Sequence, residues 1–444
     1  MDSASTTPFS SKSSATSGIA QRGAPLVPDP VPLVPTCLPP VPSLLPAITS
    51  HLNAAPRKGM AMGMSTTPTR RFDLDWLRIA AFGLLILYHC GMAFVTWGWH
   101  IKLARLDWLE PVMLFTNAWR LILLFLISGV ASAAMLAKGR EGFAASRSWR
   151  LLLPLLAGVL LIVPPQSWVE VQANGHWNGS FLRFWREEYF GFSDHLGLIL
   201  PTWNHLWFVV YLWAYSMLLA LLPAGGLAAL KRRAARLLAG GRILWLPMLA
   251  IAGVRLGLAD RFPETHDLVA DWAAHPIYGG AFLLGVAMGP NGPLWAGVAR
   301  WWRAGLVLGF AGWLGVAGIN ALPGDPAGPW VVASRLARAV QAWGMIIGLL
   351  GAAQIWLNRD HSWRQPLAEA VFPAYLIHQT IVVLSAWWLL PLAVPIAMKA
   401  SLLISTTIIG TAAFCWATAR VGWLRPFAGY GPIRPAAVAG RLHA

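Results

Sequence analysis

The sequence has little charge and almost no cysteine. Only 12% of its 444 residues are Asp, Glu, Lys or Arg, about half of the fraction typical of soluble proteins, whereas 57% are hydrophobic. The three cysteines, Cys37, Cys90 and Cys415, form neither a Cys-x-x-Cys pair nor a disulfide framework. Runs of about twenty apolar residues recur along the chain, the length that spans ~30 Å of hydrocarbon. The composition therefore predicts a polytopic membrane protein whose main partner is the lipid bilayer.

Acidic residues are also scarce, 18 against 34 Lys and Arg, so the formal net charge is +16. Such an excess could indicate a nucleic-acid partner. However, the basic residues cluster between apolar segments, as in KRRAARLLAGGR (Lys231 to Arg242), and no compact basic domain is present. We therefore expect no nucleic-acid partner and interpret these clusters as cytoplasmic loops that set the topology.

In residues 1–68, proline interrupts every apolar run. SASTTPFSSKSSATS is polar and of low complexity, and VPDPVPLVPTCLPPVPSLLP has a proline every two or three residues. Proline at this density cannot maintain a helix, so this region is neither a signal peptide nor a membrane span. We expect a disordered cytoplasmic tail. Alternatively, translation starts at Met60, Met62 or Met64, and the tail is not made.

The remaining chain is predicted to be an all-α bundle of about ten transmembrane helices, a domain over 69–425 followed by a cytoplasmic tail, 426–444. Basic and acidic loops alternate between the spans, which predicts that both termini are cytoplasmic. The expected location is the inner (plasma) membrane. The expected spans are 76–97, 112–136, 149–168, 204–222, 243–259, 272–289, 303–321, 330–357, 371–390 and 395–419.

The first span carries two polar residues, Arg78 and His89, in an otherwise apolar helix. The eleven residues between them amount to about 1100°, ~20° past three full turns, so both side chains share one face about 16 Å apart. A charged group at the centre of a span costs ~2.5–3.5 kcal/mol, so such residues usually face a bundle interior or a wet cavity. The alternatives are that Arg78 snorkels to lipid phosphates and that His89 is a buried histidine bonded to a carbonyl.

Several arginines lie at a depth similar to that of His89. Arg120, Arg255 and Arg338 fall, with His89, ~10–13 Å below the outer surface, and Arg335 lies one turn from Arg338. A layer of this kind predicts a site for an anion. The alternative is a set of independent snorkelling arginines.

Five motifs in order along the chain resemble the acyltransferase 3 family of membrane O-acyltransferases. The sequence of the segment DLDWLR…LYHCGM…WGWH is most similar to the glucan biosynthesis protein C branch. This branch is associated with adding succinyl groups to periplasmic glucans. The resemblance covers about residues 70–425. The motifs are Arg-x10-His (Arg78 to His89), LFLISG (Leu124 to Gly129), RSWRLLLP (Arg147 to Pro154), HLWFVVYLW (His205 to Trp213) and FPAYLIHQT (Phe372 to Thr380).

The resemblance implies the chemistry. A cytoplasmic acyl-CoA, such as succinyl-CoA, would donate its acyl group to a glycan acceptor outside, with His89 as general base and Arg78 as its motif partner. The sequence shows no metal-ligand spacing, and no bound cofactor is expected. Further expected substrate-binding residues are Arg78, Arg147 and Arg150 for the coenzyme, Arg120, Arg255, Arg335 and Arg338 for a charged acyl group or an oxyanion, and His205 and His378 for the cavity lining or for structural hydrogen bonds.

Other interpretations stay open. Ser128 could carry the acyl group covalently, although a Ser-Gly pair more often marks close helix packing. Tryptophans expected outside, among them Trp99 and Trp203, could stack on sugar rings or form an interfacial belt. The same fold could move acetyl groups to another polysaccharide, transport or flip an anionic substrate without chemistry, or serve as a structural partner of a glucan synthase. A glucan synthase or an exporter is an expected neighbour.

Overall fold

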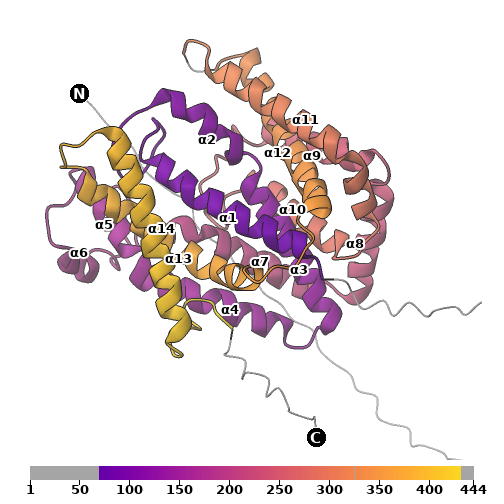
Figure 1. The fold of residues 1–444 in the computed structure, drawn as a ribbon, viewed down its shortest axis with the longest axis horizontal. Helices are drawn as coiled ribbons and strands as arrows, with labels where there is room; N and C mark the ends of the chain where they lie inside the picture. Colours follow the sequence, from indigo (N-terminus) through magenta and orange to yellow (C-terminus); the bar gives the residue numbers. More distant parts are fainter. Residues whose placement is uncertain (1–69, 325, 432–444) are drawn as a thin grey trace, which may run out of the picture. The chain divides into compact units, whose positions relative to one another are not determined.

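The computed structural model describes residues 70–324 and 326–431 and contains only helices and loops in these ranges. Figure 1 shows α1 with α13, α14, α5 and α6 to one side and α8 to α12 to the other. Short 3-10 and π-helical turns join some of the helices. The helices are α1 (Phe72–Met92), α2 (Glu110–Asn117), α3 (Arg120–Lys138), α4 (Phe143–Ala157), α5 (Pro164–Ala173), α6 (Phe181–Glu187), α7 (Trp207–Leu221), α8 (Ala224–Leu237), α9 (Arg242–Gly257), α10 (Ala274–Met288), α11 (Leu294–Asn320), α12 (Pro329–Trp356), α13 (Arg364–Leu389) and α14 (Ile396–Arg420).

The predicted all-α polytopic bundle is confirmed. Within the described ranges, eight helical segments are long and apolar enough to cross a membrane, or nine if α8 and α9, which meet at 105°, form one broken span. The fifth and sixth expected spans correspond to α9 and α10, with 16 and 15 residues. At 1.5 Å per residue these helices extend only about 22–24 Å, so the number of ten depends on these two short helices. The predictions for residues 1–68, including the later start, and for most of the C-terminal tail lie outside the described residues.

The basic segment expected to be a loop is mostly helix α8. Ala, Leu, Lys and Arg all favour helix, and Leu227, Leu230 and Ala234 recur at a spacing that places them against the core. The charged side chains occupy the exposed face. Gly240, with φ +64°, then permits the sharp turn into α9.

Glycines bring α3 and α10 into direct backbone contact. A Cβ atom added to Gly129 would lie 2.0 Å from the carbonyl oxygen of Phe282, and one added to Gly285 would lie 2.0 Å from that of Leu126. The sequence pair Ser128-Gly129 therefore marks a site of close helix packing. This contact fixes α3 beside α10, and both helices contribute side chains to the cavity described next.

Candidate active site

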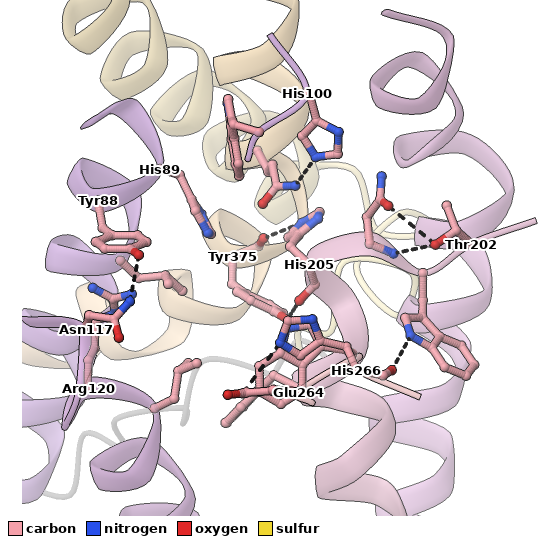
Figure 2. Close-up of a pocket in the computed structure, with 18 of the residues that line it drawn as sticks. Tyr88, His89, His100, Asn117, Arg120, Thr202, His205, Glu264, His266 and Tyr375 are labelled. Carbon is pink, nitrogen blue, oxygen red and sulfur yellow. Dashed lines mark hydrogen bonds and ion pairs between the residues drawn. The ribbon is translucent and has the colours of Figure 1, made fainter. Parts of the chain in front are cut away.

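A cavity of about 510 Å³ opens near the C-terminal end of α1 (Figure 2). It is bounded by α1, α2, α3, α7, α10 and α13 and by three connecting segments, one after α1, one before α7 and one between α9 and α10. Tryptophans 99, 203 and 207 contribute aromatic surface. The polar and titratable residues of the lining are Tyr88, His89, His100, Asn117, Arg120, Thr202, Asn204, His205, Glu264, Thr265, His266, Tyr278, Tyr375 and Gln379.

His89 is held between two other rings at the edge of this cavity. Its ring stacks on that of Trp99, with centroids 5.3 Å apart and planes at 21°, and lies edge to edge with that of His378, with centroids 5.0 Å apart and planes at 15°. Its Nδ1 atom lies 2.7 Å from Nε2 of His378. Three of the motif residues that are distant in sequence thus meet, because α13 packs along α1 and His205, in the 3-10 turn just before α7, contacts His378.

The hydrogen bonds of His378 determine which nitrogen of His89 carries a proton. Nδ1 of His378 lies 2.7 Å from the carbonyl oxygen of Tyr375, which can only accept, so this nitrogen must donate. In the neutral ring, the state that burial favours, Nε2 of His378 then accepts from Nδ1–H of His89. It follows that Nε2 of His89 has a free lone pair, and among the described residues no side chain or carbonyl bonds to it. A base is therefore available at the cavity wall.

His205 both lines the cavity and makes structural hydrogen bonds. Its Nε2 atom donates to the carbonyl oxygens of Tyr375 and Leu376, at 3.2 and 3.1 Å. Nδ1 is consequently unprotonated, and it is buried without a partner among the described residues. His378 lies behind His89 and is not part of the lining. The two histidines therefore differ: one faces the cavity, and the other orients His89.

Arg120 brings a buried positive charge to the cavity wall. It is the first residue of α3 and is 3% exposed. Its Nη1 atom donates to Oγ1 of Thr116 at 2.9 Å, and the guanidinium lies 4.2 Å from the ring centroid of Tyr88. Nε lacks a partner among the described residues, and no carboxylate there pairs with this guanidinium. Such an unpaired cation is suited to an anionic group of a ligand.

The other arginines expected in this layer lie beside the cavity or outside it. Arg338 lies close enough to Tyr88 and Arg255 for their charges to interact, but neither Arg255 nor Arg338 lines the cavity. Arg335 forms an ion pair with the exposed Asp260, and this hydrogen bond lowers the pKa of the Asp260 carboxyl group. The structure thus brings Arg120 and His89 into one cavity and leaves Arg335 outside it.

The arginines expected to bind the coenzyme lie toward the N-terminal end of α1. Arg78 donates to the carbonyl oxygen of Ala368 at 3.0 Å, Arg147 donates to two serine hydroxyls, and Arg150 is exposed. None of the three lines the cavity. Phe82, between Arg78 and His89 on α1, packs on the rings of Tyr375 and Phe208, with centroids 5.5 and 6.3 Å away. Buried aromatic rings therefore separate these arginines from the cavity.

Glu264 is a cavity residue that the sequence did not predict. It is the acidic residue of the lining, and its side chain is 46% exposed. Tyr278 donates its hydroxyl to Oε1 at 2.6 Å. Desolvation opposes ionisation, but the hydrogen bond from Tyr278 and the neighbouring His266 and Arg255 side chains outweigh it and lower the pKa of Glu264. The carboxylate therefore stays ionised and can accept hydrogen bonds from a ligand.

A buried polar chain, defined as Thr380, Gln166, Gln379, His100 and Glu170, supports the loop that carries Trp99. It starts at the carbonyl oxygen of residue 162, in the π-helical turn Gly158–Ile162, which accepts from Oγ1 of Thr380 at 2.6 Å. Thr380 must then accept from Nε2 of Gln166, at 2.7 Å, so the amide oxygen of Gln166 accepts from Gln379, at 3.1 Å. The direction of each hydrogen bond in the chain thus follows from that of the one before it.

The last two members of the chain are His100, which follows Trp99, and Glu170. Gln379 also donates to Nε2 of His100, at 2.9 Å, so the proton of His100 is on Nδ1, which bonds to the Glu170 carboxylate. His100 is therefore not a free base, although it lines the cavity. Its role is to fix the position of Trp99 and hence of the stacked His89 ring.

Replacing Gln166 by methionine should destabilise the protein. Gln166 is fully buried, and its loss removes the hydrogen bonds that it makes with Thr380 and Gln379, which costs about 1–3 kcal/mol. The check is the thermal unfolding midpoint of the purified protein in detergent. Gln354→Met is the matched control, because the amide nitrogen of Gln354 is already buried without a partner among the described residues. Equal midpoints for the two variants would contradict the role of the buried polar chain.

The family of the chain can be stated once this geometry is known. The family model described as an acyltransferase domain, acyltransferase 3, matches residues 71–420 and so covers nearly every described helix. No curated protein and no solved structure matches the chain. The match includes His89, its two histidine neighbours and Arg120. The chain belongs to the acyltransferase 3 family and is a membrane acyltransferase.

Proposed function

We propose that this acyltransferase moves an acyl group from a cytoplasmic coenzyme A thioester to a hydroxyl group of a glycan on the other side of the membrane. The observation that supports this proposal most directly is the free Nε2 lone pair of His89 in a cavity that also holds Arg120. The resemblance of the first-helix motifs to the glucan biosynthesis protein C branch favours a succinyl group and periplasmic glucans as the specific substrates. The protein would then lie in the inner membrane, with both termini in the cytoplasm.

In the proposed reaction, Nε2 of His89 removes the proton of the acceptor hydroxyl as its oxygen attacks the thioester carbonyl. A carbon–oxygen bond forms, and the carbonyl oxygen becomes an oxyanion that the guanidinium of Arg120 can stabilise. When the tetrahedral intermediate collapses, the carbon–sulfur bond breaks. The leaving thiolate takes up the proton from His89. The products are therefore an ester and free coenzyme A, and His89 is neutral again.

The rest of the cavity suits a sugar. Glu264 and Asn204 offer hydrogen-bonding groups for hydroxyls, and Trp99 and Trp203 provide flat apolar surfaces. A cavity of about 510 Å³ lies within the usual range for small-ligand sites. A succinyl carboxylate would lie near Arg120, where the charges of Arg255 and Arg338 add to the positive potential.

The donor must approach from the opposite side. Arg147 has no carboxylate partner among the described residues, and with Arg78 and Arg150 it could bind the phosphates of the coenzyme. The pantetheine arm would then have to pass the rings of Phe82 and Tyr375 to reach His89. The proposal thus requires these two rings to move apart when the donor binds.

The experiment that tests the proposal compares periplasmic glucans from a deletion strain and from the same strain complemented with the wild-type gene. Mass spectrometry and anion-exchange chromatography measure the added mass and charge. Ester-linked succinyl groups that depend on the gene would support the full proposal. Acetyl esters would mean that the acyl group is not succinyl, and esters on another polysaccharide would mean that the acceptor is not a periplasmic glucan. Transport of an anionic substrate with no ester formed would contradict it.

A further inference from the structure

A second, apolar groove lies between α9 and α10, separate from the active-site cavity. Its volume is about 350 Å³, and it shares no lining residue with that cavity. Ile122 of α3 and Trp343 of α12 line it together with α9 and α10. Small residues that are exposed, Ala250 on α9 and Gly280 on α10, leave the gap open. Every lining residue is apolar, and the indole N–H of Trp343 is already bonded to the Ile243 carbonyl oxygen at 2.8 Å.

The groove ends at the basic helix α8. Leu237 and Leu238, at the C-terminus of α8, line the groove. Arg233 lies four residues before Leu237 and three before Arg236, and residues three or four apart share one side of a helix. Both arginines are exposed, and neither forms an ion pair with a described residue. Moreover, the sequence has no Asp or Glu between residues 195 and 259.

The turn between α8 and α9 is held by a different arginine. Arg242 donates to the carbonyl oxygens of Arg236, at 2.7 Å, and Ala239, at 3.3 Å. The side chains of Arg233 and Arg236, by contrast, form no hydrogen bond or ion pair within the described part of the chain. An exposed pair of cations therefore lies beside the entrance of an apolar groove, on the side of the membrane where α7 ends and α9 begins.

We propose that the groove binds an anionic phospholipid, with one acyl chain between α9 and α10 and the phosphate at Arg233 and Arg236. Ala250 lies eight residues from the start of α9, about 12 Å along the helix, within the ~15 Å depth of one leaflet. The acyl chain is complementary to the apolar lining, and the phosphate is complementary to the uncompensated arginines. This site does not depend on the reaction at His89.

Native mass spectrometry of the purified protein tests the proposal, with phosphatidylglycerol and phosphatidylcholine of identical acyl chains added in equal amounts. The wild type should retain phosphatidylglycerol preferentially. Gly280→Leu should abolish this retention, because a Cβ atom at Gly280 meets nothing within 4 Å and the leucine side chain can occupy the groove. Gly253→Leu is the matched control, since Gly253 on α9 is equally unobstructed but does not line the groove.

A second pair of variants tests the head-group contact. Arg233→Gln with Arg236→Gln should weaken the preference about fivefold for each arginine removed, the factor that corresponds to ~1 kcal/mol per basic residue. Lys231→Gln removes one charge about 160° around α8 from Arg233, on another side of the helix, and should have a smaller effect than Arg233→Gln alone. Equal retention of the two lipids by the wild type, undiminished retention by Gly280→Leu, or equal effects of Lys231→Gln and Arg233→Gln would overturn the proposal.

Discussion

Replacing His89 by glutamine should lower the rate of acyl transfer by about 10²–10⁴-fold, the usual contribution of a general base. Glutamine can still donate a hydrogen bond to His378, so the local structure is largely kept. It has no nitrogen lone pair that could take up a proton at neutral pH. Substrate affinity should change much less than the turnover number, because the ring contributes little to the surface of a cavity with so many other lining groups.

The measurement is turnover of the purified, reconstituted enzyme, with acyl-CoA and the glycan acceptor on their respective sides. His275→Gln is a suitable control, because His275 is likewise hydrogen-bonded, to Tyr215 and to the Leu268 carbonyl oxygen, but does not line the cavity. It should keep most of the activity. If His89→Gln transferred acyl groups within threefold of the wild-type rate, His89 would not be the base.

Much of the fold and part of the candidate site could be predicted from helical periodicity and from the order of the motifs. All ten expected spans overlap helices, because long apolar runs in a membrane have few alternatives to helix. Period and rise placed His89 and Arg120 at similar depth, and both line one cavity. Depth alone could not show that Arg335 pairs with Asp260, since that contact depends on how α12 packs against the end of α9.

The supporting groups could not be predicted from the sequence because their hydrogen bonds join residues that are far apart in the chain. Thr380 bonds to the carbonyl oxygen of residue 162, and Gln379 bonds to His100. No local pattern distinguishes a glutamine in such a chain from an exposed one. Glu264 was missed for a similar reason: it lies in a loop whose acidic residues fit the expected topology equally well outside the site.

Replacing His378 by leucine should lower the turnover number by about 10²-fold, although this residue does not touch the substrate. Without the acceptor at Nε2 of His378, Nδ1–H of His89 is left unpaired, and the ring can adopt the tautomer or the orientation in which Nε2 carries the proton. A base oriented by a third group loses most of its effect when that group is removed, as the serine protease triad illustrates. The Michaelis constants should be nearly unchanged, because His378 is not part of the cavity lining.

His378→Gln separates this positioning role from a merely structural one. Its amide oxygen can accept the proton of Nδ1 of His89, whereas leucine, of similar size, cannot. The glutamine variant should therefore recover at least part of the turnover lost in the leucine variant, at similar thermal unfolding midpoints. Equal turnover numbers for the two variants would mean that packing, rather than the hydrogen bond between the two histidines, keeps His89 active. A raised Michaelis constant with unchanged turnover would instead indicate that His378 acts on the substrate when the aromatic rings beneath the cavity move.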